Sequence, residues 1–269
     1  MIHPINSMIA HYQTWAAKHF TYTSASKQIK RIKGSHKGNV CFIIGNGPSL
    51  KAEDLSKLNN LGIPTFAANR VYKIFDKTDW RPTYFFCEDP IIIRDIENDI
   101  NEIVCPYKFI PIHLKWYYGV DINNATYYNL SYYRKVNADI GFCDDIHNTV
   151  IWTGTVTITA IQFAVYMGYT DIYMIGVDHS YSNMIDSNGN VIKDNTIKNY
   201  FDDSYDDGVK DELLHDLNDS TKMFYRAKQH FNPKGIHIYN ATRGGRLEVF
   251  PRVNLDTFFM EYGNEDSGE

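Results

Sequence analysis

The chain has few cysteines, and no two of them lie close together in the sequence. Its four cysteines lie far apart among 269 residues and form no Cys-x-x-Cys pair. Their spacing excludes the signatures of a zinc site and of a disulfide framework, and it predicts reduced thiols in a cytoplasmic protein. No apolar run approaches the roughly 20 residues that span a bilayer, and the N-terminus lacks the apolar centre of a signal peptide. Internal repeats, low-complexity linkers and the P-loop pattern GxxxxGK[ST] are also absent.

Acidic residues are missing from the first 40 positions. That segment holds five lysines and Arg31, so it carries +6, and because the whole chain carries −5 the remainder carries −11. The segment is expected to form a basic amphipathic helix. Such a helix either contacts the inner face of an anionic membrane or packs against the domain or against a second copy of the chain. The acidic body and the lack of a basic motif predict no nucleic-acid partner. The apolar and aromatic residues at near-helical spacing in this segment are Ile9, Tyr12, Trp15, Ala16 and His19.

From residue 37 onward, segments typical of strands alternate with segments typical of helices. The strands are expected in VCFIIG, IPTFAAN, PTYFFCED, YKFIPI, IYMIGVD and IHIYNAT, and the helices near 50–61, 155–168 and 219–231. This alternation predicts an α/β fold with a Rossmann-like, mostly parallel sheet and flanking helices. The expected parts are a basic helical extension (1–36), a catalytic domain (37–260) with a lid-like polar insert (182–214), and a flexible tail (261–269).

The first strand runs directly into the stretch GNGPSL. Gly45 and Gly47 are expected to leave bare backbone amides in a tight turn, with Pro48 opening a helix and Ser49 capping it. A strand, a glycine turn and a helix N-terminus favour phosphate or another anion. The alternative is a tight turn that holds nothing.

Polar side chains follow five of the six predicted strands. Ligands of such sheets bind at the carboxyl ends of the strands, so these side chains predict one pocket able to hydrogen-bond a ribose, a base and a phosphate. The groups concerned are Asn46, Asn69-Arg70, Glu88-Asp89, Asp178-His179 and Asn240.

Five stretches resemble the motifs of a known family, in the family's order. They are GNGPSL, AANRVY, YFFCEDP, MGYTDIYMIGVDHSYS and YNATRGGRLEVFPRV, and together they span roughly residues 38–258. They resemble the domain-of-unknown-function 115 family, which includes the motility accessory factors of flagellin glycosylation and an archaeal hydroxymethylpterin pyrophosphokinase. More distantly, the pattern is similar to bacterial sialyltransferases of glycosyltransferase family 42. The resemblance implies a variant of the glycosyltransferase A fold. It also implies transfer of a nonulosonic (sialic-type) acid from a CMP-linked donor to a surface glycan or a protein.

The resemblance also implies roles for individual residues. Asn46 and Asn69 match asparagines that hold the cytidine nucleotide, and Asp178 matches the aspartate of a Gly-x-Asp strand. Asp89 stands where the sialyltransferases have asparagine before proline, a departure that leaves the sugar nucleotide open. The full expected nucleotide-binding set is Gly45, Asn46, Gly47, Ser49, Asn69, Asp89, Asp178 and Ser180.

A base must accept the proton of the acceptor hydroxyl, and histidine suits that role. His215 lies at a distance from the last strand that matches the general base of the sialyltransferases. His179 is an equal candidate, because it ends a strand at the binding edge. Tyr181 is expected to replace a phenol that the sialyltransferases have nearby. Arg243 and Asn240 are expected to contact the acidic sugar, although a C-terminal hairpin with surface arginines is the alternative.

Two further functions stay open. In a pyrophosphokinase acting on a pterin, Glu88, Asp89 and Asp178 would bind Mg²⁺ for transfer from ATP. The glycosyltransferase hypothesis includes no metal or cofactor. A third hypothesis is a non-catalytic subunit that binds a nucleotide sugar within a glycan assembly complex, and a homo-oligomer is compatible with all three.

Overall fold

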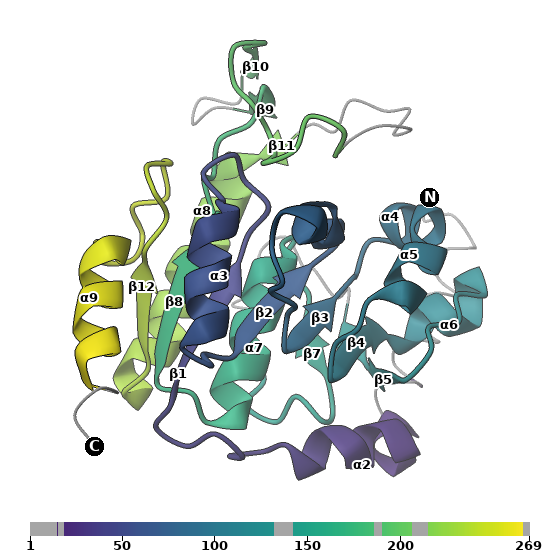
Figure 1. The fold of residues 1–269 in the computed structure, drawn as a ribbon. Helices are drawn as coiled ribbons and strands as arrows, with labels where there is room; N and C mark the ends of the chain where they lie inside the picture. Colours follow the sequence, from purple (N-terminus) through teal and green to yellow (C-terminus); the bar gives the residue numbers. More distant parts are fainter. Residues whose placement is uncertain (1–14, 16–18, 132–141, 186–189, 206–214, 266–269) are drawn as a thin grey trace.

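A seven-stranded, entirely parallel sheet forms the centre of the molecule, in the order β12-β8-β1-β2-β3-β4-β5. The computed structural model describes residues 15, 19–131, 142–185, 190–205 and 215–265. The strands are β1 (Val40–Ile44), β2 (Thr65–Ala68), β3 (Tyr84–Phe86), β4 (Tyr107–Pro111), β5 (Ala125–Tyr128), β8 (Asp171–Ile175) and β12 (His237–Asn240). The chain winds outward from β1 through β5 and then returns to the other side of β1, where it adds β8 and β12. The predicted Rossmann-like α/β fold is confirmed (Figure 1).

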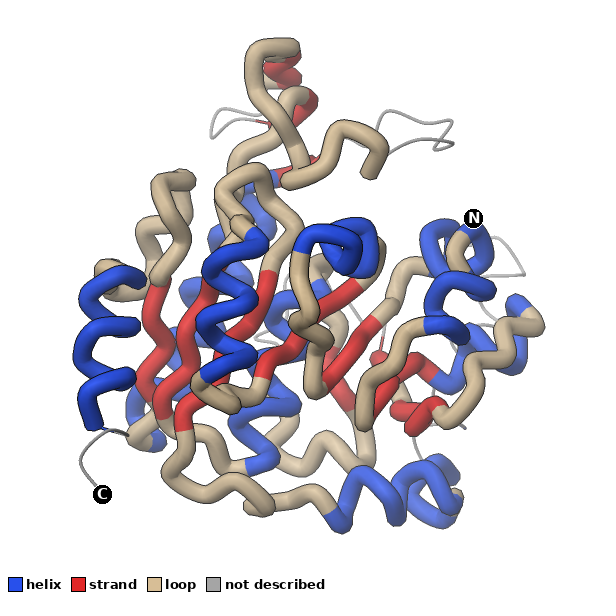
Figure 2. Tube along the Cα trace, in the orientation of Figure 1, coloured by secondary structure: helices blue, strands red, loops and turns tan. Residues whose placement is uncertain are grey.

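Helices cover both faces of this sheet (Figure 2). One face carries α2 (Ser24–Arg31), α7 (Val156–Met167) and α8 (Leu217–Phe231). The other carries α3 (Ala52–Asn60), η2 (Val71–Lys77), α4 (Pro90–Asp95), α5 (Glu97–Glu102), α6 (Ile112–Tyr118) and α9 (Leu255–Glu265). Short elements complete the description: η1 (Phe20–Tyr22), η3 (Asn232–Lys234), β6 (Leu130–Ser131) and β7 (Val150–Ile151).

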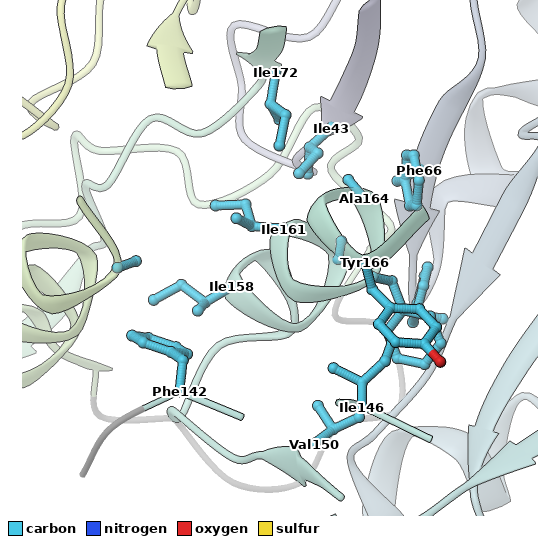
Figure 3. Packing of buried hydrophobic residues seen from close by; sticks show 14 of the residues in the cluster. Ile43, Phe66, Phe142, Ile146, Val150, Ile158, Ile161, Ala164, Tyr166 and Ile172 are labelled. Atoms are coloured by element: carbon cyan, nitrogen blue, oxygen red, sulfur yellow. The ribbon is translucent and has the colours of Figure 1, made fainter. Parts of the chain in front are cut away.

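The strands read as continuous apolar runs because both of their faces are buried. In β1, Cys41 and Ile43 pack on the α7 face, whereas Phe42 and Ile44 pack on the α3 face. Helix α7 is buried on nearly every side, which explains why its sequence shows no polar stripe. Figure 3 shows Ile161 of α7 directed toward the sheet.

The described part of the N-terminal extension packs on this body. Ile29 of α2 is fully buried, and the Ser26 hydroxyl donates a 2.7 Å hydrogen bond to the carbonyl of His147. The helix expected around Ile9 and Tyr12 lies largely outside the described residues. Among the described residues, no helix combines the length and the apolar character needed to cross a membrane.

The polar insert after β8 folds into a small sheet of its own above the carboxyl ends of the main strands (Figure 1). It consists of β9 (Asn183–Ile185), β10 (Val191–Lys193) and β11 (His215–Asp216). At the other end of the chain, α9 runs to Glu265, so residues 261–265, expected in a flexible tail, are helical.

Candidate functional site

A cavity of about 480 Å³ opens at the carboxyl ends of β1, β2, β3 and β8, where the winding of the sheet reverses. That is where ligands of such sheets bind, and the volume suits a small-molecule ligand. The first turns of α7 and α8 and the insert complete its walls. Most of the residues predicted from the sequence line it: Gly45, Asn46, Gly47, Asn69, Asp89, Asp178, His179, Ser180 and Tyr181.

The glycine turn packs against the end of β8. The Gly45 amide donates to the carbonyl of Ile175 at 2.8 Å, and the Gly47 amide donates to the carbonyl of Gly176 at 2.8 Å. The expectation of bare amides at these two glycines is therefore wrong, since both amides are already bonded. A Cβ on Gly45 would lie 2.3 Å from the Gly176 oxygen, so glycine is needed here for close backbone approach.

Asp178 fixes the same turn from its other side. Its Oδ2 accepts from the Ser49 hydroxyl at 2.7 Å and from the Ser49 amide at 3.3 Å. A Cβ on Gly47 would lie 2.0 Å from that oxygen. Burial raises the pKa of Asp178, while the bonds from Ser49 lower it. Ser49 and Pro48 do not begin the helix as expected, because α3 starts at Ala52 and the Ser49 hydroxyl is committed to Asp178.

Asn46 and Asn69 both line the cavity, and their side chains are only partly hydrogen-bonded within the described part of the protein. The Asn46 amide nitrogen donates to the Ala68 carbonyl at 3.0 Å, which holds the side chain in place. The Oδ1 atoms of both asparagines are buried, and neither has a hydrogen-bond partner among the described residues. Asn69 also has φ of 57°, a left-handed conformation that is strained for most residues. Buried acceptors without a partner indicate a ligand that brings donors, such as hydroxyl or amino groups.

Glu88 is one of the polar groups predicted at the strand ends, with a specific role only in the magnesium hypothesis. It follows β3, is 6% exposed, and lines the cavity. The Tyr128 hydroxyl donates to its Oε1 at 2.6 Å. Burial raises the pKa of Glu88 to about 7, although the Tyr128 and Thr159 hydroxyls lower it. A signal was present in the sequence: alternation along β3 places Glu88 on the same buried face as Phe86.

Asp89 caps α4. Its Oδ1 accepts from the amides of Ile91 at 2.7 Å and Ile92 at 3.2 Å, as an N-cap aspartate does. Among the described residues, no cluster of three or more His, Cys, Asp or Glu side chains is arranged to hold a metal ion. A magnesium ion bound by Glu88, Asp89 and Asp178 would compete with the bonds these side chains already make.

The N-terminus of α7 contributes a wall that the sequence reading missed. The loop from Trp152 to Thr155 and the first helical residues, Val156 and Thr157, line the cavity. Thr155 occupies the N-cap position and makes no side-chain capping bond among the described residues. The first amides of a helix have no intrahelical acceptor and carry partial positive charge. The Ile158 amide already donates to the Thr155 carbonyl at 3.2 Å, so the amides that can serve an anionic group in the cavity are those of Val156 and Thr157.

His179 faces the first turn of α8. Its Nε2 lies 2.8 Å from Oγ1 of Thr221, and that hydroxyl donates to the Leu217 carbonyl at 2.7 Å. The threonine oxygen must then accept, so Nε2 carries the proton and Nδ1 is the basic nitrogen. Burial lowers the pKa of His179, which keeps the ring neutral at pH 7. Its φ of 53° is left-handed, as at Asn69.

Tyr181 and Ser180 line the cavity next to His179. Burial and the nearby Asp178 raise the pKa of Tyr181, so its hydroxyl stays protonated and can donate. His215 lies in β11, where its backbone pairs with Met184 of β9. The side chain of His215 lies outside the described part of the structure, so its predicted role as a base stays a prediction.

Asn240 and Arg243 are not among the residues that line the cavity. The Asn240 amide is occupied on both sides, donating to the Leu247 carbonyl and accepting from the Thr242 amide. Arg243 makes paired hydrogen bonds to Asp54 of α3 and to Asp256 of α9. The structure therefore gives both residues structural roles and does not support the expected contact with a sugar.

The loop after β12 instead supports Asp178. The Arg246 amide donates to the Asp178 carbonyl at 2.8 Å, and the Thr242 hydroxyl accepts from the Val177 amide. A Cβ on Gly245 would lie 2.8 Å from the Asp178 oxygen. This motif holds the end of β8 in place from behind the cavity.

The insert closes over the cavity. Tyr200 and Tyr205 line it with their rings stacked at 3.9 Å, and the Phe201 amide donates to the carbonyl of Asn46 at 3.1 Å. Arg70, which is 4% exposed, donates to the Tyr205 carbonyl at 2.8 Å and pairs with Asp95. Residues 199–205 of the insert are thus docked on the body, and the role of the insert as a lid stays a prediction.

The described lining of the cavity is rich in acidic side chains and poor in basic ones. Its described lining includes one histidine and no lysine or arginine. The carboxyl groups in the same lining are Glu88, Asp89, Asp178, Asp216 and Asp219. An anionic ligand therefore depends on helix amides and on the protonation of carboxyl groups for its stabilisation.

Comparison with known proteins agrees with the fold. The structure of the MAf glycosyltransferase from Magnetospirillum magneticum AMB-1 is similar, with a TM-score of 0.51 and 12% sequence identity. The match covers 93% of this chain and 42% of that chain, so the present chain spans less than half of the larger protein. No curated protein sequence matches the chain. The sequence pattern of the 6-hydroxymethylpterin diphosphokinase MptE-like proteins matches residues 14–184, which is more than half of the chain. The chain therefore belongs to the MptE-like family.

Proposed function

We propose that this protein is a glycosyltransferase that takes a nonulosonic (sialic-type) acid from a CMP-linked donor and transfers it to a surface glycan or a protein. The observation that carries the proposal is the pair of buried amide oxygens of Asn46 and Asn69, which have no hydrogen-bond partner in the described part of the chain and lie beside a cavity of nucleotide size. Ribose hydroxyls and the amino group of cytosine are donors of the kind these oxygens require. The likeness of the fold to a glycosyltransferase supports the same reaction class.

The reaction breaks the bond between the sugar and the phosphate of CMP. Negative charge then develops on the leaving phosphate, and the amides at the N-terminus of α7 would stabilise it. The Tyr181 hydroxyl, kept protonated by burial, would donate to the same leaving group. These groups are fixed before the reaction, which is the condition under which they lower the barrier most.

The acceptor hydroxyl must lose a proton as it attacks the sugar. His179 would accept this proton at Nδ1, because Nε2–H is held by Thr221 and the ring is neutral at pH 7. His215 is the second candidate base, because its distance from the last strand matches that of the general base in the sialyltransferases. Contact of residues 1–36 with a membrane and assembly into a homo-oligomer stay proposals.

Pyrophosphoryl transfer to a pterin is a second candidate function. The name of the family favours it, and three carboxyl groups of the predicted magnesium set line one cavity. Asp89 and Asp178 would have to give up their bonds to α4 and Ser49 to bind a metal ion. A third candidate, a non-catalytic subunit that binds a nucleotide sugar, would use the same asparagines without the histidine.

Thermal-shift measurements with CTP, CMP, UDP and ATP, each with and without Mg²⁺, separate these functions. Stabilisation by CMP in the presence of EDTA is expected here. Stabilisation by ATP that requires Mg²⁺ would instead support the pyrophosphokinase. A protein that binds CMP but never turns over a CMP-linked sugar would be the binding subunit.

A further inference from the structure

The outer side of α2 carries a group of cations that the proposed function does not use. Lys30 and Arg31 lie three and four residues after Lys27, so the three side chains share one side of the helix, and all of them are exposed. We propose that this basic side of α2 binds an anionic lipid surface and thereby holds the protein with its cavity directed away from the membrane. The inference does not depend on the reaction that the cavity supports.

The fold holds these cations in place before any partner arrives. On the opposite side of α2, Ile29 is fully buried, and the buried Ser26 bonds the His147 carbonyl. At the start of the helix, the Thr23 hydroxyl accepts from the Ser26 amide at 3.1 Å. The apolar side of α2 is therefore used in the core, so the helix contacts a lipid surface through its charges and does not insert. Side chains on a helix that is already folded lose less entropy when they bind.

Most of the positive charge in this region is not neutralised by the rest of the described chain. Lys33 pairs with Asp145, and the neighbouring Asp144 pairs with Lys234. Clusters of four or more Lys and Arg side chains on an amphipathic helix are typical of surfaces that bind acidic lipids. The exposed cations of α2 and the linker after it that make no ion pair within the described chain are Lys27, Lys30, Arg31 and Lys37.

The position of α2 in the fold places its basic side far from the cavity. The linker after α2 bonds the C-terminal end of α7, since the His36 amide donates to the Met167 carbonyl at 2.8 Å. The other end of α7, at Val156, lines the cavity. A helix of 12 residues is about 18 Å long, so α2 and the cavity lie at opposite ends of α7 (Figure 1). A protein held by α2 thus keeps its cavity open to solvent.

The distribution of charge over the whole chain favours approach by this side. The first 40 residues carry +6 and the remainder carries −11, so an anionic surface attracts the extension and repels the body. A nucleic acid would need a longer basic track, which the acidic body does not provide. A lipid surface needs no complementary shape. Tyr22, which is 80% exposed just before α2, supplies an aromatic ring of the kind that favours the headgroup region.

Cosedimentation of the full chain with lipid vesicles tests this inference. Vesicles of phosphatidylglycerol and phosphatidylcholine in equal parts should bind the protein, and vesicles of phosphatidylcholine alone should not. Because the attraction acts between exposed charges, the bound fraction should fall steeply as salt is added.

Acetylation of lysines, followed by mass spectrometry, locates the contact in the wild-type protein. Anionic vesicles should slow the modification of Lys27, Lys30 and Lys37 several-fold. The exposed Lys198 of the insert and Lys222 of α8 should react as fast as in the free protein. This measurement needs no variant, so it tests the inference even if a variant does not fold.

A triple variant assigns the affinity to the charges of α2. Replacing Lys27, Lys30 and Arg31 by glutamine keeps residues that favour a helix and removes three charges. The dissociation constant for anionic vesicles should then rise about a hundredfold. A matched control removes the same charge from exposed lysines outside α2 and should bind vesicles as the wild type does. The control substitutions are Lys51→Gln, Lys198→Gln and Lys222→Gln.

Three results would each overturn the inference: no binding of the wild type to anionic vesicles, equal binding to neutral ones, or wild-type affinity in the α2 variant. Equal loss of affinity in the control, or protection of Lys198 and Lys222 as strong as that of Lys27, would also overturn it. Tighter binding of duplex DNA through the same three side chains would replace the lipid surface by a nucleic acid. The proposed function is tested separately, by the binding of CMP in the absence of vesicles.

Discussion

At the scale of single residues, Asn69 unites a strained backbone with an unsatisfied side chain. Its φ of 57° is unfavourable for most residues, and its Oδ1 is buried without a partner among the described residues. The buried acceptor costs stability in the free protein, and a ligand that donates to Oδ1 would recover that cost. The same argument applies to Asn46, whose Oδ1 is also buried and unpartnered.

Asn69→Gly tests this argument directly. Glycine tolerates the left-handed φ but lacks the amide, so the folded protein should keep its melting temperature while CMP binds about ten- to a hundredfold more weakly. Calorimetric titration of CMP measures the affinity, and thermal unfolding measures stability. Asn69→Ala is the matched control, because it loses the amide and also strains the backbone. Unchanged CMP affinity in Asn69→Gly would show that this asparagine serves the turn alone.

His179 gives a prediction on rate and on pH. His179→Ala should lower kcat about a hundredfold or more, with a small effect on CMP affinity, because a base acts chiefly in the transition state. Only neutral His179 can accept a proton, and burial lowers its pKa below 6.5, so activity should be lost only as the pH falls below that value. The pH profile of kcat for the wild type checks this sign. A variant His215→Ala that loses activity, while His179→Ala keeps it, would assign the base to His215.

Many of the site residues could be predicted from their positions at the strand ends. The predictions that were wrong have physical causes. Asn46, Asn69, Asp178 and His179 reach one cavity because parallel strands end at one edge. Gly45 and Gly47 were expected to present free amides, but a glycine turn can also be selected for close packing, as against Gly176 here. The role of Tyr128 could not be predicted, since it depends on a side-chain contact across 40 residues.

At the scale of elements, the segment 199–205 of the insert is anchored on the body beside the cavity. Tyr205 is 3% exposed, and Lys73 and Lys77 bond Ser204 and Asp202. The docked segment covers the turn at Asn46, since the Phe201 amide bonds its carbonyl.

Tyr205→Ala should release this segment. Amide hydrogen exchange of residues 199–205 should become at least tenfold faster, and CMP should bind more weakly, because the cavity loses one wall and the carbonyl partner of Arg70 is no longer fixed. Lys198→Ala is the control, since it breaks only an ion pair between two largely exposed side chains, Lys198 and Asp203. Equal exchange rates in Tyr205→Ala and the wild type would mean that the segment does not depend on this anchor.

The buried apolar strands and the longer helices could be predicted, whereas the edge strand β5 and the short helices could not. β1, β2, β3, β4, β8 and β12 match the predicted strand segments, and α3, α7 and α8 match the predicted helices, with β8 beginning one residue earlier and α8 two residues earlier than expected. β5 was missed because its residues Ala125 to Tyr127 are only partly buried at the edge of the sheet. Helices α4, α5 and α6 are six or seven residues long, too short to show helical periodicity.

At the scale of the whole molecule, α2 belongs to the packed body. Ile29 is fully buried in the core cluster of the α7 face, whereas the basic residues Lys27 and Lys30 on the same helix are exposed. The positive charge of the extension and its apolar contact with the core thus lie on different sides of one helix.

Ile29→Ala should therefore lower the free energy of unfolding of the whole domain by about 2–4 kcal/mol. Urea unfolding followed by circular dichroism measures this change. Lys30→Ala, on the exposed side, should change stability by less than about 0.5 kcal/mol. If Ile29→Ala unfolds with the midpoint of the wild type, α2 is not part of the cooperative unit.

The central claim is that the protein transfers nonulosonic acids from CMP-linked donors. The most direct measurement is the release of CMP from CMP–N-acetylneuraminic acid and related CMP-nonulosonates in the presence of EDTA, followed by chromatography. Wild-type protein should release CMP over many turnovers, Asn69→Gly should require more donor, and His179→Ala should be slow at saturating donor. No CMP release from any of these donors, together with Mg²⁺-dependent release of AMP from ATP in the presence of a hydroxymethylpterin, would contradict the account.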